Sequence, residues 1–95
     1  MIKLLIFYLE GCPYCRNARE AVKELQSENP VYQSTKTEWI EENESPEIAN
    51  EYDYYRVPSI FCGKNKLYEC SPTDDYNIIK KNIDNAFKFV LKEKH

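Results

Sequence analysis

The chain has 95 residues, of which 42% are hydrophobic and 31% are charged, so it can form one domain with a modest core. Its net charge of −3 and its lack of dense lysine or arginine clusters argue against nucleic-acid binding. The longest apolar run, residues 4–9, is too short to span a bilayer, and the N-terminus has no signal-peptide pattern. We therefore expect a cytoplasmic monomer with a single domain at 1–95 and no membrane or nucleic-acid partner.

Turn residues and hydrophobic spacing predict alternating strands and helices. The nearly continuous apolar run Ile2–Leu9 is typical of a strand that is buried on both faces of a sheet. Pro13 suits the first turn of a helix, where its missing N–H is harmless. The predicted elements are a strand at 2–9, a helix at 13–27, a strand at 31–37, a short helix at 46–52, strands at 57–62 and 66–70, and a final helix capped by Thr73 or Asp74.

This order, β-α-β-α-β-β-α, predicts an α/β fold with a mixed four-stranded sheet flanked by helices. The crossover through the first helix gives parallel strands, and a turn at residues 63–65 adds an antiparallel hairpin. In that hairpin Cys62 is expected to face about Leu67, and Cys70 is expected to face about Ser59. The final helix is expected to bury one apolar face, which consists of Ile78, Ile79, Ile83, Phe87, Val90 and Leu91.

Two cysteines separated by two residues, Cys12 and Cys15, lie between the first strand and the first helix. At a helix start, free N–H groups and the helix dipole stabilise a thiolate, here at Cys12. Cys15 follows one helical turn later, close enough for its sulfur to reach that of Cys12. Cys12 can attack a target disulfide, and Cys15 can then resolve the mixed disulfide by attacking Cys12. The pattern therefore predicts thiol–disulfide exchange.

Two other functions stay open, because a Cys-x-x-Cys pair is also half of a metal site. A zinc or iron–sulfur module would need Cys62 and Cys70 as further ligands, but their spacing is not that of a zinc knuckle. We therefore expect no metal and interpret both as small half-buried residues, with Cys70 a candidate regulatory thiol near the site. The other alternative is a redox-inert interaction domain, since fold does not fix function.

The segment Cys12-Pro13-Tyr14-Cys15 and the step Val57-Pro58 resemble the glutaredoxin family of the thioredoxin superfamily, and the likeness covers nearly the whole chain. It implies a thioredoxin-like fold, with Cys12 as the nucleophile and Cys15 as the resolving thiol. It further implies that Pro58 is cis and lies beside the Cys12 sulfur, and that the Val57 backbone pairs with the substrate. No bound cofactor is implied, and glutathione is a candidate co-substrate.

Some residues near the cysteines depart from the pattern of that family. Leu9 stands where the family carries a cation, and Glu10 adds a negative charge that opposes a thiolate at Cys12. Arg16 can compensate for this charge. Arg56 stands in place of the usual threonine and can offer its cation to a carboxylate or support the thiolate.

A second group of departures lies near the end of the last predicted strand. The Gly-Gly pair of the family is absent, and Tyr68 and Glu69 are expected to crowd the space that glutathione needs. Asp74 and Asp75 resemble the acidic pair that holds the glutathione amine, but helix capping is the simpler interpretation. Elsewhere, Trp39 is expected to be a packing residue, and the terminal His95 is not expected to assist catalysis.

These observations predict a dithiol oxidoreductase that reduces protein or small-molecule disulfides through Cys12 and Cys15. Its electron donor is expected to be a thiol or an NADPH-dependent reductase. Tyr54 and Tyr55 are candidates to line a peptide groove. The residues expected to contact the substrate or its thiol are Pro13, Tyr14, Arg16, Arg56, Val57 and Pro58.

Overall fold

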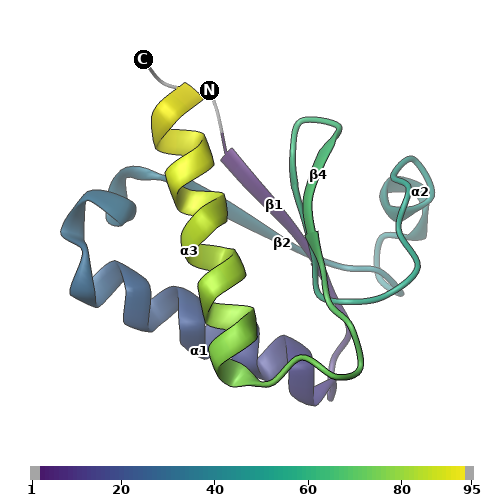
Figure 1. The fold of residues 1–95 in the computed structure, drawn as a ribbon. Coiled ribbons are helices and arrows are strands. Elements are labelled where there is room, and N and C mark those ends of the chain that lie inside the picture. Colours follow the sequence, from purple (N-terminus) through teal and green to yellow (C-terminus); the bar gives the residue numbers. More distant parts are fainter. Residues whose placement is uncertain (1–2, 94–95) are drawn as a thin grey trace.

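The structure, a computed structural model, describes residues 3–93 as one sheet with helical segments on both faces (Figure 1). Ile2, where the first strand was expected to begin, and His95 lie outside the described residues. The elements are β1 (Lys3–Tyr8), α1 (Pro13–Glu28), the 3₁₀ helix η1 (Pro30–Ser34), β2 (Lys36–Glu41), α2 (Pro46–Ala49), β3 (Ser59–Cys62), β4 (Asn65–Glu69) and α3 (Tyr76–Glu93).

The four strands lie in the order β2-β1-β3-β4. β1 is parallel to β2, whereas β3 is antiparallel to both β1 and β4. The predicted mixed sheet and the predicted order of its helices and strands are therefore confirmed. Because β1 lies between β2 and β3, the turn that follows it opens near the middle of the sheet.

The predicted strand at Val31–Thr37 is wrong. Most of this segment forms η1, in which Pro30 occupies the first turn and Tyr32 donates its amide to the Asn29 carbonyl at 2.8 Å. The Tyr32 ring stacks on Phe87 with 4.6 Å between ring centroids, so tertiary packing overrides the local preference for a strand. β2 follows instead at Lys36–Glu41 and pairs with the whole of β1.

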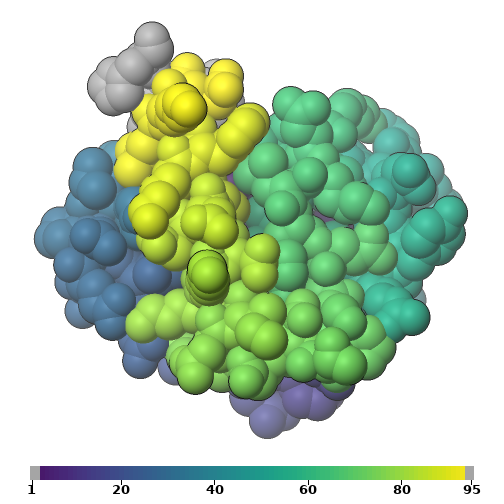
Figure 2. Space-filling model, viewed as in Figure 1, coloured from purple at the N-terminus to yellow at the C-terminus, as the bar shows by residue number. Residues whose placement is uncertain are grey.

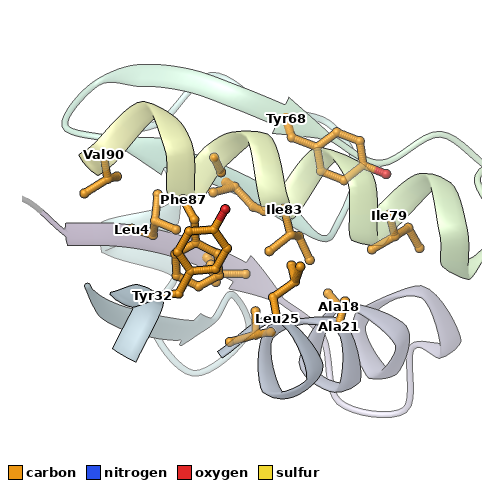
Figure 3. Packing of buried hydrophobic residues seen from close by; sticks show 14 of the residues in the cluster. Leu4, Ala18, Ala21, Leu25, Tyr32, Tyr68, Ile79, Ile83, Phe87 and Val90 are labelled. Carbon is orange, nitrogen blue, oxygen red and sulfur yellow. The ribbon is translucent and has the colours of Figure 1, made fainter. Parts of the chain in front are cut away.

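Alternate residues of β1 point to two separate cores, as a strand with a period of two requires. Leu4 and Ile6 face the main core between the sheet and helices α1 and α3 (Figure 3). Leu5 and Phe7 face a smaller core with Ile40 and Phe61, which is covered by residues 49–57. The main core also buries Ala18, Ala21, Val22, Leu25, Tyr32, Ile60, Tyr68, Cys70, Ile79, Ile83, Ala86, Phe87 and Val90.

Helix α3 begins later than expected, because Asp75 rather than Thr73 or Asp74 accepts the Ile78 amide at 2.9 Å. Ile78 itself is 43% exposed, so its assignment to the buried face is wrong. The helix and the hairpin form one continuous face of the molecule, yellow and green in Figure 2. Within residues 3–93, no helix is both long enough and apolar enough to span a bilayer.

The hairpin has a different register from the expected one. Ser59 pairs with Glu69 and Cys62 pairs with Asn65, because a bulge at Ile60/Phe61 shifts the pairing between the two strands. A bulge inserts one residue and cannot be counted from turn chemistry alone. Cys62 and Cys70 still do not face each other.

Alkaline pH is expected to destabilise the fold through tyrosines that are buried or half-buried. Burial, and next the bond to Asp74, raises the pKa of Tyr68 above its ordinary value of 10.0, so the unfolded chain releases this proton first. The unfolded state then binds fewer protons, and stability falls as the pH rises above 10. Burial is also the largest cause that raises the pKa of Tyr32, Tyr54 and Tyr76. A hydrogen bond to the carboxylate of Asp84, Glu42 and Glu24, respectively, raises each pKa further.

Urea unfolding at about pH 8 and about pH 10.5 measures this effect. We expect the free energy of unfolding of the wild type to fall by at least about 1 kcal/mol over this range. The fall should be smaller in Tyr68→Phe and unchanged in Tyr55→Phe, whose side chain is 88% exposed. Equal falls in the two variants would contradict a contribution from Tyr68.

Candidate active site

The Cys12 turn is built by the backbone between β1 and α1. Gly11 has a φ of +81°, a left-handed conformation that glycine adopts without strain. Cys12 is the N-cap residue of α1, and Pro13 is the first helical residue, as predicted. The Cys12 amide donates to the Leu9 carbonyl at 3.3 Å, and the Arg16 amide donates to the Cys12 carbonyl at 3.0 Å. These bonds hold the Cys12 side chain at the helix start.

The two cysteines of the turn have different environments. Cys12 is half-buried, whereas Cys15 is only 4% exposed. Burial is the largest cause that raises the pKa of Cys15 to about 12, a bond with the Leu9 backbone lowers it, and the Cys12 side chain and the charge of Cys70 raise it further. Cys15 is therefore a protonated, shielded thiol beside an accessible one.

This contrast predicts selective alkylation. At about pH 7.5 iodoacetamide is expected to label Cys12 at least about tenfold faster than Cys15, because thiols react as thiolates and Cys15 is buried and protonated. Fragmentation mass spectra of the tryptic peptide 4–16 would locate the label. In urea the two rates should converge, and equal rates in the native protein would contradict the assigned environments.

A groove of about 280 Å³ lies beside the turn. The Val57–Pro58 bond before β3 is cis, as the resemblance implies, and Val57 contributes to the groove wall. The Tyr14 hydroxyl donates to the Pro72 carbonyl at 2.7 Å, and both residues line the groove. The lining residues are Leu9, Tyr14, Glu42, Tyr55, Arg56, Val57, Cys70, Ser71 and Pro72. Tyr55 thus lies where it was expected, whereas Tyr54 stacks on Phe7 with 4.8 Å between ring centroids.

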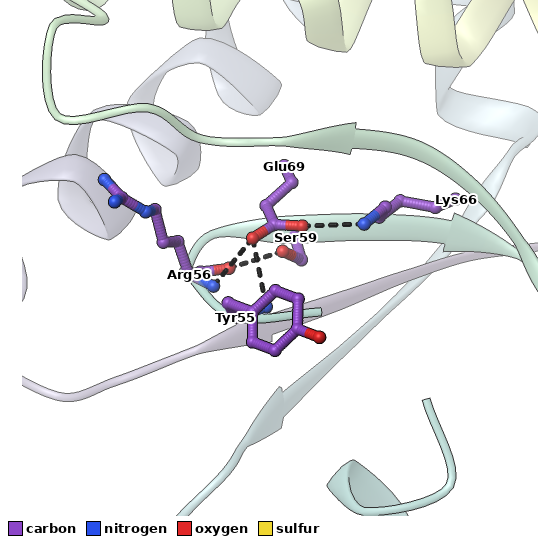
Figure 4. Close-up of polar contacts among 5 residues, drawn as sticks. All are labelled: Tyr55, Arg56, Ser59, Lys66 and Glu69. Carbon is purple, nitrogen blue, oxygen red and sulfur yellow. Dashed lines mark hydrogen bonds and ion pairs between the residues drawn. The ribbon is translucent and has the colours of Figure 1, made fainter. Parts of the chain in front are cut away.

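Glu69 organises the chain that precedes Pro58 (Figure 4). Its carboxylate accepts the amides of Tyr55 at 3.0 Å and Arg56 at 2.9 Å, and it pairs with Lys66 at 2.7 Å. Partial burial alone would raise the pKa of Glu69, but these bonds together hold it below its ordinary value. The Arg56 guanidinium makes no ion pair within residues 3–93, so its charge is free to meet an anion at the groove.

Tyr68 and Glu69, which were expected to crowd the space for glutathione, both lie outside the groove. Tyr68 is 8% exposed in the main core, and Glu69 bonds to the backbone before Pro58, so neither side chain lines the groove. Asp74 is not a helix cap, because it accepts the Ser71 amide at 3.0 Å and the Tyr68 hydroxyl at 2.6 Å. These bonds order the chain between β4 and α3.

A second hollow of about 360 Å³ is lined by both cysteines of the turn, Cys12 and Cys15, and by Tyr8 at the end of β1. Arg16 lines it, and so does Arg19, which the sequence pattern did not single out. The Arg19 guanidinium lies 4.4 Å from the centroid of the Trp39 ring, and Trp39 packs against the main core, as predicted. Only the spacing of Arg19 one turn after Arg16 could have signalled this position.

The metal alternative requires further ligands close to Cys12 and Cys15. Within residues 3–93 no group of three or more His, Cys, Asp or Glu side chains is placed to hold a metal ion. All four cysteines are free thiols. Cys62 contributes to neither hollow, whereas Cys70 lines the groove.

Comparison with known proteins gives the family. The chain is 30% identical over 84 residues to thioredoxin of Methanocaldococcus jannaschii, an alignment that spans 86% of this chain and 96% of the relative. No protein-family model matches the sequence.

Two solved thioredoxins share the fold. The germline-specific thioredoxin Deadhead of Drosophila melanogaster matches with a TM-score of 0.64, 16% identity and coverage of 94% of this chain and 80% of that chain. A mutant thioredoxin from Halobacterium salinarum matches with a TM-score of 0.57, 21% identity and coverage of 88% and 73%. The predicted thioredoxin-like fold is therefore confirmed, and the sequence relative shows that the chain belongs to the thioredoxin family.

Proposed function

We propose that this protein is a glutaredoxin-like thiol–disulfide oxidoreductase that reduces protein or small-molecule disulfides through Cys12 and Cys15. Membership of the thioredoxin family supports redox activity of this general kind. The observation that carries the proposal is the pairing of a half-buried Cys12 at the N-cap of α1 with a Cys15 that is 4% exposed. Exchange needs one accessible sulfur and one shielded sulfur within reach of it.

In the proposed reaction the Cys12 thiolate attacks one sulfur of the target disulfide, and the other target sulfur leaves as a thiolate. Cys15 then attacks the Cys12 sulfur, transfers its proton to the departing thiol, and forms the Cys12–Cys15 disulfide. Once Cys12 is in the mixed disulfide it carries no negative charge. The charge of Cys12 then no longer raises the pKa of Cys15. Cys15 therefore forms a thiolate more readily when it has to attack the mixed disulfide.

The groove supports binding of an extended target chain beside Cys12. The Val57 backbone has no hydrogen-bond partner among those found within residues 3–93, and Val57 lines the groove, so it can pair with a target backbone. Arg56 supplies a cation for a carboxylate near the target disulfide. With Pro13, Tyr14, Arg16 and Pro58, these are the proposed binding residues.

We also propose an electron donor, an oligomeric state and a cellular location for this protein. The donor is a thiol such as glutathione, or an NADPH-dependent reductase, and no bound cofactor takes part. We also propose a cytoplasmic monomer, because reducing systems keep such thiols ready for exchange in the cytosol.

Turnover with two donors tests the proposal. Reduction of a small disulfide and of a protein disulfide would be followed by NADPH oxidation, with glutathione and its reductase in one assay and thioredoxin reductase in the other. We expect turnover with at least one donor, and Cys62→Ser is the matched control because Cys62 lines neither hollow. No turnover with either donor, combined with failure of Cys12 to react with disulfides, would reject the proposal.

A further inference from the structure

Two hydrogen bonds tie the chain around Cys70 to Pro58 and to Tyr14. The Cys70 amide donates to the Pro58 carbonyl at 3.0 Å, and two residues later Pro72 accepts the Tyr14 hydroxyl at 2.7 Å. Figure 1 shows the segment between β4 and α3 passing beside the start of α1. The Cys70 backbone is thus bonded to the cis proline, and Pro72 ties the same segment to the tyrosine that separates Cys12 from Cys15.

Cys70 also interacts through charge with the two cysteines of the turn. Burial is the largest cause that raises the pKa of Cys70, the nearby Tyr68 hydroxyl lowers it, and the charges of Asp74 and Cys12 raise it. The charge of Cys70 in turn raises the pKa of Cys15. By contrast, the pKa of Cys62 is raised by burial and by Glu93 alone.

Cys70 also lines the groove proposed above for the target chain. It is 3% exposed, yet it lines the groove together with Leu9 and Tyr14. Leu9 connects the groove to the turn, because its backbone bonds both to the Cys12 amide and to Cys15. A target joined to Cys12 would therefore lie against a wall that carries a third thiol.

We propose that Cys70 is a second resolving thiol for mixed disulfides on Cys12. The Cys70 sulfur attacks the Cys12 sulfur, the bond between Cys12 and the target breaks, and a Cys12–Cys70 disulfide forms. The target leaves as a thiolate and takes up the proton that Cys70 loses. The two electrons that reduce the target disulfide come from Cys12 and Cys70. This inference rests on the proposed function, since its first step is the same attack by Cys12.

The test uses the full chain with Cys15→Ser, which removes the first resolving thiol, and 2-hydroxyethyl disulfide as the probe. Trypsin places Cys12 in peptide 4–16, Cys62 in peptide 57–64 and Cys70 in peptide 67–80. After acid quenching and alkylation, mass spectrometry should find peptide 4–16 linked to 67–80 at least about fivefold more than to 57–64. Cys15→Ala serves as a second variant if the serine disturbs folding.

Two double variants make the result specific. Cys15→Ser with Cys70→Ser should keep the hydroxyethyl adduct on Cys12, whereas Cys15→Ser with Cys62→Ser should still form the Cys12–Cys70 link. A persistent adduct on Cys12 in the single variant, or equal linking of Cys12 to Cys62, would overturn the inference while leaving the proposed function intact. If Cys12 carried neither the hydroxyethyl adduct nor a disulfide link in any of these variants, both proposals would be overturned.

Discussion

A Cys12→Ser variant is expected to lose disulfide reduction by at least about a thousandfold. Cys12 is the half-buried thiol at the start of α1, and Cys15 is 4% exposed with its pKa raised to about 12 by burial, so no other thiol of the turn can begin exchange. A serine hydroxyl cannot form the mixed disulfide. The measurement is the initial rate of NADPH oxidation with the donor that supports the wild type.

Cys62→Ser is the control for this loss, because it also replaces a half-buried cysteine with serine. Its rate should stay within about twofold of the wild type, since Cys62 lines neither hollow. A Cys12→Ser variant that kept a tenth of the wild-type rate while remaining folded would assign the nucleophile to another residue.

A Phe87→Ala variant is expected to lower the free energy of unfolding by about 4 kcal/mol. Phe87 is fully buried in the main core and stacks on Tyr32 with ring planes only 11° apart, so its removal leaves a cavity between α3 and η1. A loss of this size is a large share of the stability of a domain this small. Urea unfolding followed by circular dichroism would measure it.

The matched control is Phe89→Ala, which removes the same side chain two residues later on α3. Phe89 is half-buried and is not among the side chains packed against the main core, so we expect a loss below about 1.5 kcal/mol. Similar losses for the two variants would mean that Phe87 does not hold the position in the core that Figure 3 shows.

The sequence predicted the fold well where local signals agreed with tertiary packing. The apolar run before Cys12, the proline after it and the turn near Gly63 placed β1, α1 and the hairpin within one or two residues of their ends. β2 was misplaced because it is an edge strand that pairs only with β1 and contains many polar residues. Its sequence therefore lacks the apolar pattern by which a strand is recognised. The bulge at Ile60/Phe61 moved the hairpin register, and nothing in the local sequence marks a bulge there.

The candidate site could likewise be predicted only where local sequence patterns mark its residues. Cys12 and Cys15 carry a spacing that can be read directly, and the Val57-Pro58 step carries a family pattern. The contribution of Arg19 depends on Trp39, and the place of Cys70 depends on its bond to Pro58. Such contacts join distant parts of the chain, so only the folded arrangement reveals them.

Redox titration of the wild-type protein followed by peptide mapping tests the role of the Cys12–Cys15 pair most directly. The protein would be equilibrated in glutathione buffers of graded potential, quenched with acid, alkylated and digested. We predict that the oxidised form carries a disulfide within peptide 4–16, between Cys12 and Cys15, as its main product in one two-electron transition. If Cys12 and Cys15 remained reduced thiols across the whole range, the assignment of this pair as the redox centre would be contradicted.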